Sequence, residues 1–381
     1  MGSARTSDRR DRIAGSLLGT AVGDALGLPR EGLSPVRARR FFGDDLQHRL
    51  VLGRGMVSDD TEHSCFVGQA LLSADGDTDR FARALAWKLR WWMLGLPAGV
   101  GLGTARAIAK LWLGFGPSRS GVRSAGNGPA MRAAVLGVCA AAEPELIDAW
   151  VGVASRVTHV DERAVRAARL VAVAARHAAT RDPSEVSHRE FLDIAERALA
   201  DADDELVGVL RTLRAHLDRG AAVAEFAGAI GQGNGVGGYA YHSVPVAVYG
   251  WLAHPGDFRA AVTEVVRLGG DADTTGAIVG GIAGAGVGRE RIPAEWIDGL
   301  WEWPRTVAWI TELADRLARR FPVEGAPDMH VDELRVAWPL ILPRNLLFLC
   351  VVLAHGFRRL VPPYGGGGGA TDASPNGART P

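Results

Sequence analysis

The stretch VVRLGGDADTTGAIVGGIAGAGVG, residues 265–288, decides the fold. Its polar start holds two glycines and two aspartates, and a long run of apolar and small residues follows, which is the pattern of a helix that begins near Asp271 or Asp273. Because Gly284 and Gly288 have no side chains, a neighbouring helix can approach the backbone closely at both positions. The stretch therefore predicts a buried helix with carboxylates at its N-terminus.

The rest of the chain repeats the helical pattern. β-Branched alternation is scarce, and apolar residues recur at helical spacing in 81–94, 164–178 and 185–199. Gly- and Pro-rich joints separate such stretches, and the long ones between residues 95 and 129 are more often functional than merely connective. We predict an all-α fold with one compact multi-helix domain over residues 11–304.

Length and composition set further limits. The chain has 381 residues and is 47% hydrophobic, which is enough for a large core. Lys plus Arg and Asp plus Glu are both 43, so the formal net charge is zero and no global field attracts nucleic acid; no nucleic-acid-binding patch is evident. The three cysteines are scattered, which argues against a disulfide scaffold and against a cysteine zinc site.

Both ends of the chain differ from its middle. Residues 1–10 are polar and residues 365–381 are rich in Gly, Pro, Ser and Thr, so we predict that both are disordered. Residues 305–364 are expected to form a C-terminal helical extension. Its apolar run, LLFLCVVLAHGF at 346–357, is shorter than the roughly 20 residues of a spanning helix, so no transmembrane segment is predicted. We expect the run to pack against the protein's own helices, with a membrane-surface contact as the alternative, in a cytoplasmic monomer.

A second acidic cluster occurs in MVSDDTEHSCFVGQALL, residues 56–72, where the pattern predicts a helix that begins near Asp59. Helix capping explains part of this cluster, because Asp59 followed by Glu62 fits a capping box and acids are favoured in a first helical turn. A cap needs one short oxygen side chain, yet both clusters present two carboxylates plus hydroxyls. The surplus carboxylates must be solvated, protonated or neutralised by a cation.

The ligand types of the two clusters favour hard divalent ions. Carboxylate and hydroxyl oxygens suit Mg²⁺ or Mn²⁺, and the absence of paired His or Cys nearby argues against Zn²⁺ and copper. The spacing lets neighbouring oxygens face two ions, with Asp273 able to bridge them and the hydroxyls of Ser58 and Thr274 filling further positions. We therefore predict a site for two Mg²⁺ or Mn²⁺ ions.

At this point the sequence resembles the ADP-ribosylglycohydrolase family, which includes the glycohydrolase that reactivates dinitrogenase reductase. The resemblance covers residues 13 to about 300 and rests on five stretches in the family's order, whose combination is far more specific than any one of them. The stretches are GSLLGTAVGDALGLPREG (15–32), SDDT (58–61), AGNGPAMRAAVLG (125–137), VTHVDERAV (157–165), and GGYAYHSVPVAVYG (237–250) with LGGDADTTGAIVGGIAGAGVG (268–288).

The resemblance implies an all-α domain with a dinuclear metal cleft at its centre, and hydrolysis of the bond between the terminal ribose of ADP-ribose and an acceptor. The substrate would be an ADP-ribosylated protein or small molecule. Glu31 matches the acid after the family's GDALG turn and is the candidate acid/base, a role that Asp59 or Asp60 could share. The residues that match the family's metal ligands are Ser58, Asp59, Asp60, Asp271, Asp273 and Thr274, with Ser58 standing where many members have Thr.

Substrate-binding residues are expected in two places. Gly126, Asn127 and Gly128 lie in a glycine-rich turn before a helix, whose N–H groups suit a pyrophosphate, although an ordinary Asn-Gly turn has the same sequence. His159 follows a threonine, and the family places such a pair beside ADP-ribose, whereas a lone histidine is more often structural. The glycine-rich segment 231–238 lacks a preceding strand and a Gly-Lys-Ser/Thr ending, so it is not a nucleotide-binding loop of the usual kinds.

Two other functions compete with this interpretation. A two-metal hydrolase of phosphoesters or nucleotides would use the same oxygen ligands. A non-catalytic binding or structural relative would keep the fold, but it has no need for carboxylates beyond those that cap helices. The identity of the acceptor depends on loops such as 95–129 rather than on the metal residues.

Overall fold

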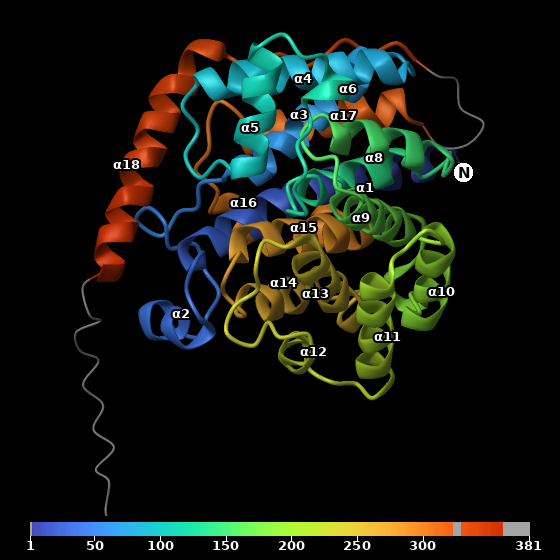
Figure 1. The fold of residues 1–381 in the computed structure, drawn as a ribbon, viewed down its shortest axis with the longest axis vertical. Coiled ribbons are helices and arrows are strands. Elements are labelled where there is room, and N and C mark those ends of the chain that lie inside the picture. The colour runs from blue at the N-terminus through green and yellow to red at the C-terminus, as the bar shows by residue number, and fades with distance from the viewer. Residues whose placement is uncertain (1, 323–328, 361–381) are drawn as a thin grey trace, which may run out of the picture.

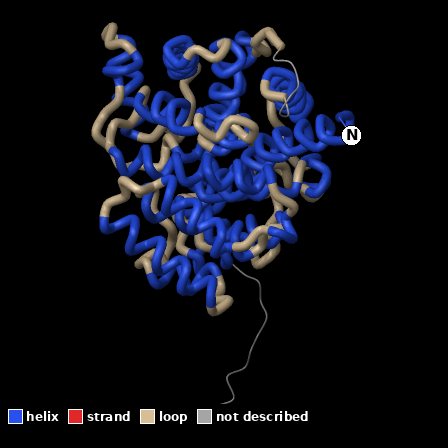
Figure 2. The backbone as a smooth tube through the Cα atoms, turned by 90° about the vertical axis from the view of Figure 1, so that its right-hand side faces the viewer, coloured by secondary structure: helices blue, strands red, loops and turns tan. Residues whose placement is uncertain are grey.

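A computed structural model describes residues 2–322 and 329–360 of the chain. Within these ranges every regular element is a helix, either α or 3-10, and no strand is formed (Figure 2). Six isolated bridges between loop residues are the only β-type pairing in the same ranges. The all-α prediction is therefore confirmed.

The helices follow one another through short and long loops (Figure 1). The α-helices are α1 (Gly2–Gly27), α2 (Pro35–Phe42), α3 (Asp59–Ala74), α4 (Thr78–Leu94), α5 (Leu102–Trp112), α6 (Pro117–Ser120), α7 (Ala134–Cys139), α8 (Leu146–Arg156), α9 (Glu162–Thr180), α10 (His188–Ala198), α11 (Asp204–Asp218), α12 (Val223–Ala229), α13 (Ala240–Ala253), α14 (Phe258–Val266), α15 (Ala272–Val287), α16 (Ala294–Asp298), α17 (Val307–Arg320) and α18 (Ile341–Leu360). The 3-10 helices are η1 (Leu28–Arg30), η2 (Ala130–Arg132), η3 (Pro183–Glu185), η4 (Arg289–Arg291) and η5 (Trp338–Leu340).

The centre of the fold is the packing of α1 on α15, which cross the middle of the molecule in Figure 1. Both helices present glycines at every fourth residue along the contact. A Cβ added to Gly19 would lie 2.2 Å from the carbonyl oxygen of Gly280, and one added to Gly23 would lie 1.9 Å from that of Gly276. The two backbones therefore touch directly, and the close-packing role predicted for the glycines of residues 265–288 is what the structure shows.

Several other helices cover this pair. α9, α13 and α14 pack against α15, while α3 and α17 pack against α1. One continuous hydrophobic core joins them, and it includes fully buried aromatic side chains such as Phe81, Phe191 and Trp251. This packing holds the N-terminal ends of α3 and α15 in fixed positions.

The structure modifies the predicted domain boundaries. Residues 2–10, expected to be disordered, form the first turns of α1. α17 packs into the core against α1 and α3, so the helical body continues past the predicted end at residue 304. The predicted disordered tail at 365–381 lies outside the described residues.

α18 runs along one edge of the molecule (Figure 1). It spans 20 residues, and with η5 it forms a 23-residue apolar segment, Trp338–Leu360. This segment is long and apolar enough to cross a membrane, and only 22% of its most apolar window is buried in the protein. No other helix in the described ranges passes this test. The run predicted from sequence, residues 346–357, is shorter than this segment because Arg344 and Asn345 interrupt the apolar pattern, and the structure buries both side chains against the protein.

Candidate functional site

The N-terminal ends of α3 and α15 meet beside a cavity of about 610 Å³. Regions that are distant in sequence form its wall: the turn after α1, the start of α3, the long loops between α4 and α7, the loop between α8 and α9, the loop before α13, and the loop before α15 with the start of that helix. The lining residues are Glu31, Gly32, Asp59, Gly99, Gly101, Leu102, Gly103, Thr104, Ser124, Gly126, Asn127, Gly128, Met131, His159, Val236, Gly237, Gly238, Gly270, Asp271, Asp273 and Thr274.

Ser58 caps the start of α3. Its side-chain oxygen accepts a hydrogen bond from the N–H of Asp60 at 3.2 Å, and its hydroxyl donates to Asp60 Oδ2 at 2.8 Å. The helix begins at Asp59, as predicted, but the cap is Ser58, and Glu62 points away from it. The capping box proposed for Asp59 and Glu62 is therefore wrong, because the Glu62 carboxylate bonds to the side chains of Arg305 and Trp92 instead.

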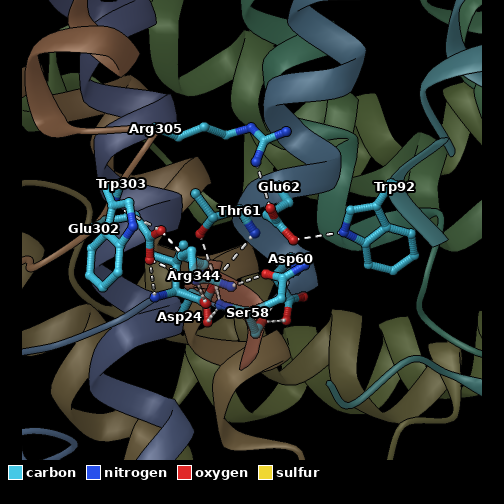
Figure 3. Close-up of polar contacts among 12 residues, drawn as sticks. Asp24, Ser58, Asp60, Thr61, Glu62, Trp92, Glu302, Trp303, Arg305 and Arg344 are labelled. Atoms are coloured by element: carbon cyan, nitrogen blue, oxygen red, sulfur yellow. Dashed lines mark hydrogen bonds and ion pairs between the residues drawn. The ribbon is translucent and has the colours of Figure 1, made fainter. Parts of the chain in front are cut away.

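Asp24 on α1 is a residue of the site that the sequence analysis missed. It is fully buried, and it accepts hydrogen bonds from Ser58 N at 2.9 Å, Thr61 N at 3.2 Å and Thr61 Oγ1 at 2.5 Å (Figure 3). Burial raises the pKa of Asp24 to about 7. Its position, an acid inside the apolar run LLGTAVGDALGL, was the available signal, since an acid within a buried helix requires a partner.

The loop before α15 places the second acidic cluster. Gly269 and Gly270 both have positive φ, and a Cβ on Gly270 would lie 2.2 Å from the carbonyl oxygen of Val236, so this turn requires glycine. Asp271 is the N-cap residue, but its side chain makes no capping hydrogen bond and instead accepts one from Asn127 Nδ2 at 2.6 Å. Capping therefore does not account for the Asp271 carboxylate.

The two clusters touch each other. Thr274 Oγ1 donates to Asp60 Oδ2 at 3.3 Å, which joins the start of α15 to the start of α3. The other oxygen of that carboxylate, Asp60 Oδ1, is buried and has no hydrogen-bond partner. Asp273 uses one oxygen to accept from the N–H of Thr274 at 2.9 Å.

The shared environment disfavours ionisation of these acids. Burial raises the pKa of Asp59, Asp60 and Asp273 well above the usual value, and the neighbouring carboxylates raise each of them further. Burial also raises the pKa of Asp271, although its hydrogen bond from Asn127 opposes the change. Such a cluster is stable at neutral pH only when protons or a cation neutralise it.

Glu31 lies at the opening of the cavity, on the turn that follows η1. The backbone of this turn pairs with the loop before α15, through Gly32 N and the carbonyl oxygen of Gly270 at 2.7 Å. Desolvation by the surrounding protein and the charge of the nearby Asp271 carboxylate raise the pKa of Glu31. Arg359 of α18 donates to the carbonyl oxygen of Glu31 at 2.7 Å, so the last helix holds this turn in place.

The predicted substrate residues line the same cavity. Gly126, Asn127 and Gly128 form one wall, and Asn127 N bonds to the carbonyl oxygen of Gly238 at 3.1 Å. His159 lies against the same wall, since a Cβ on Gly128 would be 3.0 Å from its ring, and its Nδ1 is 2.9 Å from the hydroxyl of Thr158. Burial lowers the pKa of His159 to about 4, so the ring is neutral at pH 7.

Two further segments complete the wall: the first lies within the loops between residues 95 and 129 that the sequence indicated as functional, and the second was not predicted. Residues 99–104 contribute five lining residues, of which one is Thr104, and residues 236–238 contribute three more. The second segment belongs to the glycine-rich stretch that lacks the features of a nucleotide-binding loop. Its glycines leave the cavity open because they have no side chains to fill it.

Two buried ion pairs stabilise the position of α3 and of the residue that precedes its cap (Figure 3). Arg305 Nη1 lies 2.6 Å from Glu62 Oε1, and Trp92 Nε1 donates to the other oxygen of Glu62 at 2.7 Å. Arg344 of α18 lies 2.7 Å from Glu302, and the same pair holds the backbone of Val57, the residue before Ser58.

The donor set fits a divalent cation, although no three His, Cys, Asp or Glu side chains among the described residues converge on one point as they stand. All donors are oxygens, several acids are buried together, and Asp60 Oδ1 has no partner in the protein. The residues predicted from sequence, Ser58, Asp59, Asp60, Asp271, Asp273 and Thr274, all lie at this junction of α3 and α15.

The chain is similar to known proteins along most of its length. The family model described as ADP-ribosylglycohydrolase matches residues 5–327. An uncharacterised protein of Archaeoglobus fulgidus is 31% identical over 328 residues, which cover 81% of this chain and 96% of that protein. The ADP-ribosyl-[dinitrogen reductase] glycohydrolase of Rhodospirillum rubrum is 27% identical over 314 residues, with 76% and 90% covered.

A solved structure, described as an ADP-ribosylglycohydrolase-related protein complex, superimposes with a TM-score of 0.60 at 28% identity, and the match covers 82% of this chain and 98% of that one. The family match includes α17 and ends before α18. The match across residues 5–327, the helical fold and the motifs that meet at the cavity lead to one conclusion: this chain belongs to the ADP-ribosylglycohydrolase family.

Proposed function

We propose that the protein is a metal-dependent hydrolase that cleaves the glycosidic bond between ADP-ribose and an acceptor, such as a protein side chain. The observation that carries the proposal is the junction of α3 and α15, where two acidic helix starts face one cavity and a buried carboxylate oxygen, Asp60 Oδ1, has no partner. Family membership supports the reaction class. The cytoplasmic location and the monomeric state stay predictions.

The proposed holders of two Mg²⁺ or Mn²⁺ ions are Ser58, Asp59, Asp60, Asp271, Asp273 and Thr274. When bound, such ions would neutralise the acids, orient the ribose hydroxyls and a water, and stabilise charge that develops in the reaction. Asp24 has a different role in this proposal. It accepts bonds from the backbone of Ser58 and Thr61, and so it fixes the start of α3 beneath the ligands.

The cavity residues divide the remaining tasks. Gly126 and Gly128 have no side chains and would leave room for the pyrophosphate beside them, and the neutral His159 ring would contact the sugar or phosphate as a hydrogen-bonding group. In the hydrolysis, the bond from ribose C1″ to the acceptor breaks and a water oxygen bonds to C1″. Glu31 is proposed to exchange the proton, because it lines the cavity and its raised pKa favours the protonated form that a general acid needs.

Product analysis tests this function. Purified protein is incubated with ADP-ribosylated arginine, serine and nucleic-acid substrates, each with Mg²⁺, with Mn²⁺ and with a chelator. Released ADP-ribose that the chelator abolishes supports the proposal. Release of phosphate or AMP without ADP-ribose would instead show a two-metal phosphoester or nucleotide hydrolase, and no release from any substrate would favour a non-catalytic relative.

Glu31→Gln tests the proton-transfer role separately. We expect turnover to fall by about 10²- to 10⁴-fold while Mn²⁺ binding is unchanged, because the variant loses a proton donor rather than a ligand. Full activity in this variant would move the role to Asp59 or Asp60.

A further inference from the structure

The outer face of α18 is an unpartnered apolar stripe. Its members recur at intervals of three and four residues, so they lie on one side of the helix, and they are between 37% and 79% exposed. Over the 20 residues of α18 the stripe extends about 30 Å, which exceeds the scattered apolar exposure of ordinary surfaces. The stripe consists of Leu342, Leu346, Leu349, Leu353, Phe357 and Leu360.

The inner face of the same helix is fixed to the protein along its whole length. Arg344 forms the buried pair with Glu302, and Asn345 Nδ2 donates to the carbonyl oxygen of Gly95 at 2.7 Å. Near the other end, His355 Nε2 donates to the carbonyl oxygen of Leu50 at 2.6 Å, and Arg359 holds the Glu31 turn.

These contacts decide how α18 could meet a membrane. Although η5 and α18 together are long enough to span a bilayer, spanning would remove the buried Arg344 from Glu302 and place it in lipid, at a cost of several kcal/mol. The helix can instead lie flat, with its outer face toward the lipid and the protein body in the place of the polar face that an isolated interfacial helix needs.

The charged residues within 334–360 are all arginines. Residues 334–360 contain no Asp or Glu, and the exposed charged residues are Arg335 before the helix and Arg358 near its end. Trp338, an aromatic side chain of the type enriched at membrane interfaces, is 46% exposed beside the start of the stripe. An apolar strip with basic residues at both ends is complementary to a bilayer with anionic headgroups.

The same charges disfavour the other occupants. Two copies paired through this stripe would bring Arg358 against Arg358 in a parallel arrangement and Arg358 against Arg335 in an antiparallel one, with no acid within residues 334–360 to compensate. The chain's own segment 361–381 carries only Val361 and Tyr364 as large apolar or aromatic residues other than proline, too few to cover six exposed side chains.

We propose that α18 docks the enzyme flat onto an anionic membrane surface through the stripe. Self-packing was predicted for residues 346–357 because the run is apolar on more than one face. The structure packs one of those faces, centred on Phe348, and leaves the other in solvent. This inference does not depend on the proposed reaction.

The test is flotation of the full-length protein with vesicles of phosphatidylcholine alone and of phosphatidylcholine with about 30% phosphatidylglycerol. We expect the wild type to float with the anionic vesicles, and Leu349→Gln/Leu353→Gln to lose binding by at least about tenfold, because two exposed leucines no longer enter the lipid. The matched control, Val36→Gln/Val207→Gln, removes two exposed apolar side chains from α2 and α11 and should bind like the wild type.

Three results would overturn the proposal. They are failure of the wild type to float with anionic vesicles, equal flotation of the Leu349→Gln/Leu353→Gln variant, and a doubled mass in sedimentation that this variant reverses without any vesicle binding. The last result would assign the stripe to a second copy. Equal melting temperatures of the two double variants, measured in parallel, show that lost flotation does not reflect unfolding.

Discussion

The starts of α3 and α15 carry similar acidic clusters, but different forces place them. α15 is positioned by direct backbone packing, since its glycines lie against those of α1 with no side chains between them. α3 is positioned by a polar network: Asp24 binds its first N–H groups, and the ion pairs Glu62–Arg305 and Glu302–Arg344 support it from behind.

The difference teaches how a cluster of buried acids is held in place. The rigid α1–α15 contact fixes one half of the site with little polar chemistry. The other half relies on charges that need one another, and part of that support, Arg344, comes from α18, which lies beyond the family match at residues 5–327. The two halves should therefore fail in different ways when they are altered.

The largest effect is expected from Arg344→Met. The substitution leaves the Glu302 carboxylate buried without its partner, so we expect the free energy of unfolding to fall by about 4 kcal/mol in chemical denaturation. Glu302→Leu/Arg344→Met should recover much of the loss because no unpaired charge remains. The control Arg156→Met breaks the exposed pair with Glu162 and should cost less than about 1 kcal/mol.

Equal losses in Arg344→Met and Arg156→Met would show that the polar network does not hold α3. A double variant that is less stable than Arg344→Met alone would point to packing by the arginine stem rather than to the unpaired carboxylate.

Gly280→Ala alters the other half and should cost about 3 kcal/mol. Its Cβ would lie 2.1 Å from the carbonyl oxygen of Gly19, so the two helices must separate. The matched control is Gly208→Ala in α11, where the Cβ meets nothing within 4 Å; this helix-interior change should stabilise by about 0.5–1 kcal/mol. If both variants had the same stability, direct backbone packing would not position α15.

The features of the site that depend on short-range sequence patterns were predictable from the sequence. The spaced glycines of α15 and the polar starts of both helices are short patterns that can be read directly from the sequence. The sequence therefore predicted both helices and a shared site for all six proposed ligands. The Glu302–Arg344 pair was not predictable, because it joins residues that are distant from the acidic clusters in sequence and its charges look like ordinary surface residues until burial is known.

The end of the chain shows the same limit. The apolar run at 346–357 was recognised, but which face it buries depends on four hydrogen bonds, from Arg344, Asn345, His355 and Arg359, to loops far away in sequence. Asp24 was overlooked for a related reason, since its partners lie 34 and 37 residues later.

A smaller effect, a change of a few degrees in the melting temperature, is expected when the pH is changed. The buried acids of both clusters have pKa values that are raised in the folded protein, and Asp24 reaches about 7. Their ionisation therefore opposes folding: in metal-free protein, the stability that these acids contribute is fully present below about pH 4 and is lost as pH rises toward about 7 and beyond. Mn²⁺ favours the ionised acids, so it should raise the melting temperature more at about pH 8 than at about pH 5.

Melting curves with a chelator and with Mn²⁺ at several pH values check this prediction, and Asp60→Asn/Asp273→Asn should flatten the dependence in both conditions. A melting temperature of the chelated protein that rises steadily from pH 5 to pH 8 would contradict the raised pKa values.

The most direct measurement of the central claim is calorimetric titration of the protein with Mn²⁺. We predict that the wild type binds two ions, and that Asp60→Ala in α3 and Asp271→Ala in α15 each lose at least one, because the two helix starts bind the ions jointly. Asp204→Ala is the matched control, an exposed acid in the first turn of α11, and should bind two ions as the wild type does. Unchanged stoichiometry and affinity in both Asp60→Ala and Asp271→Ala would contradict the account.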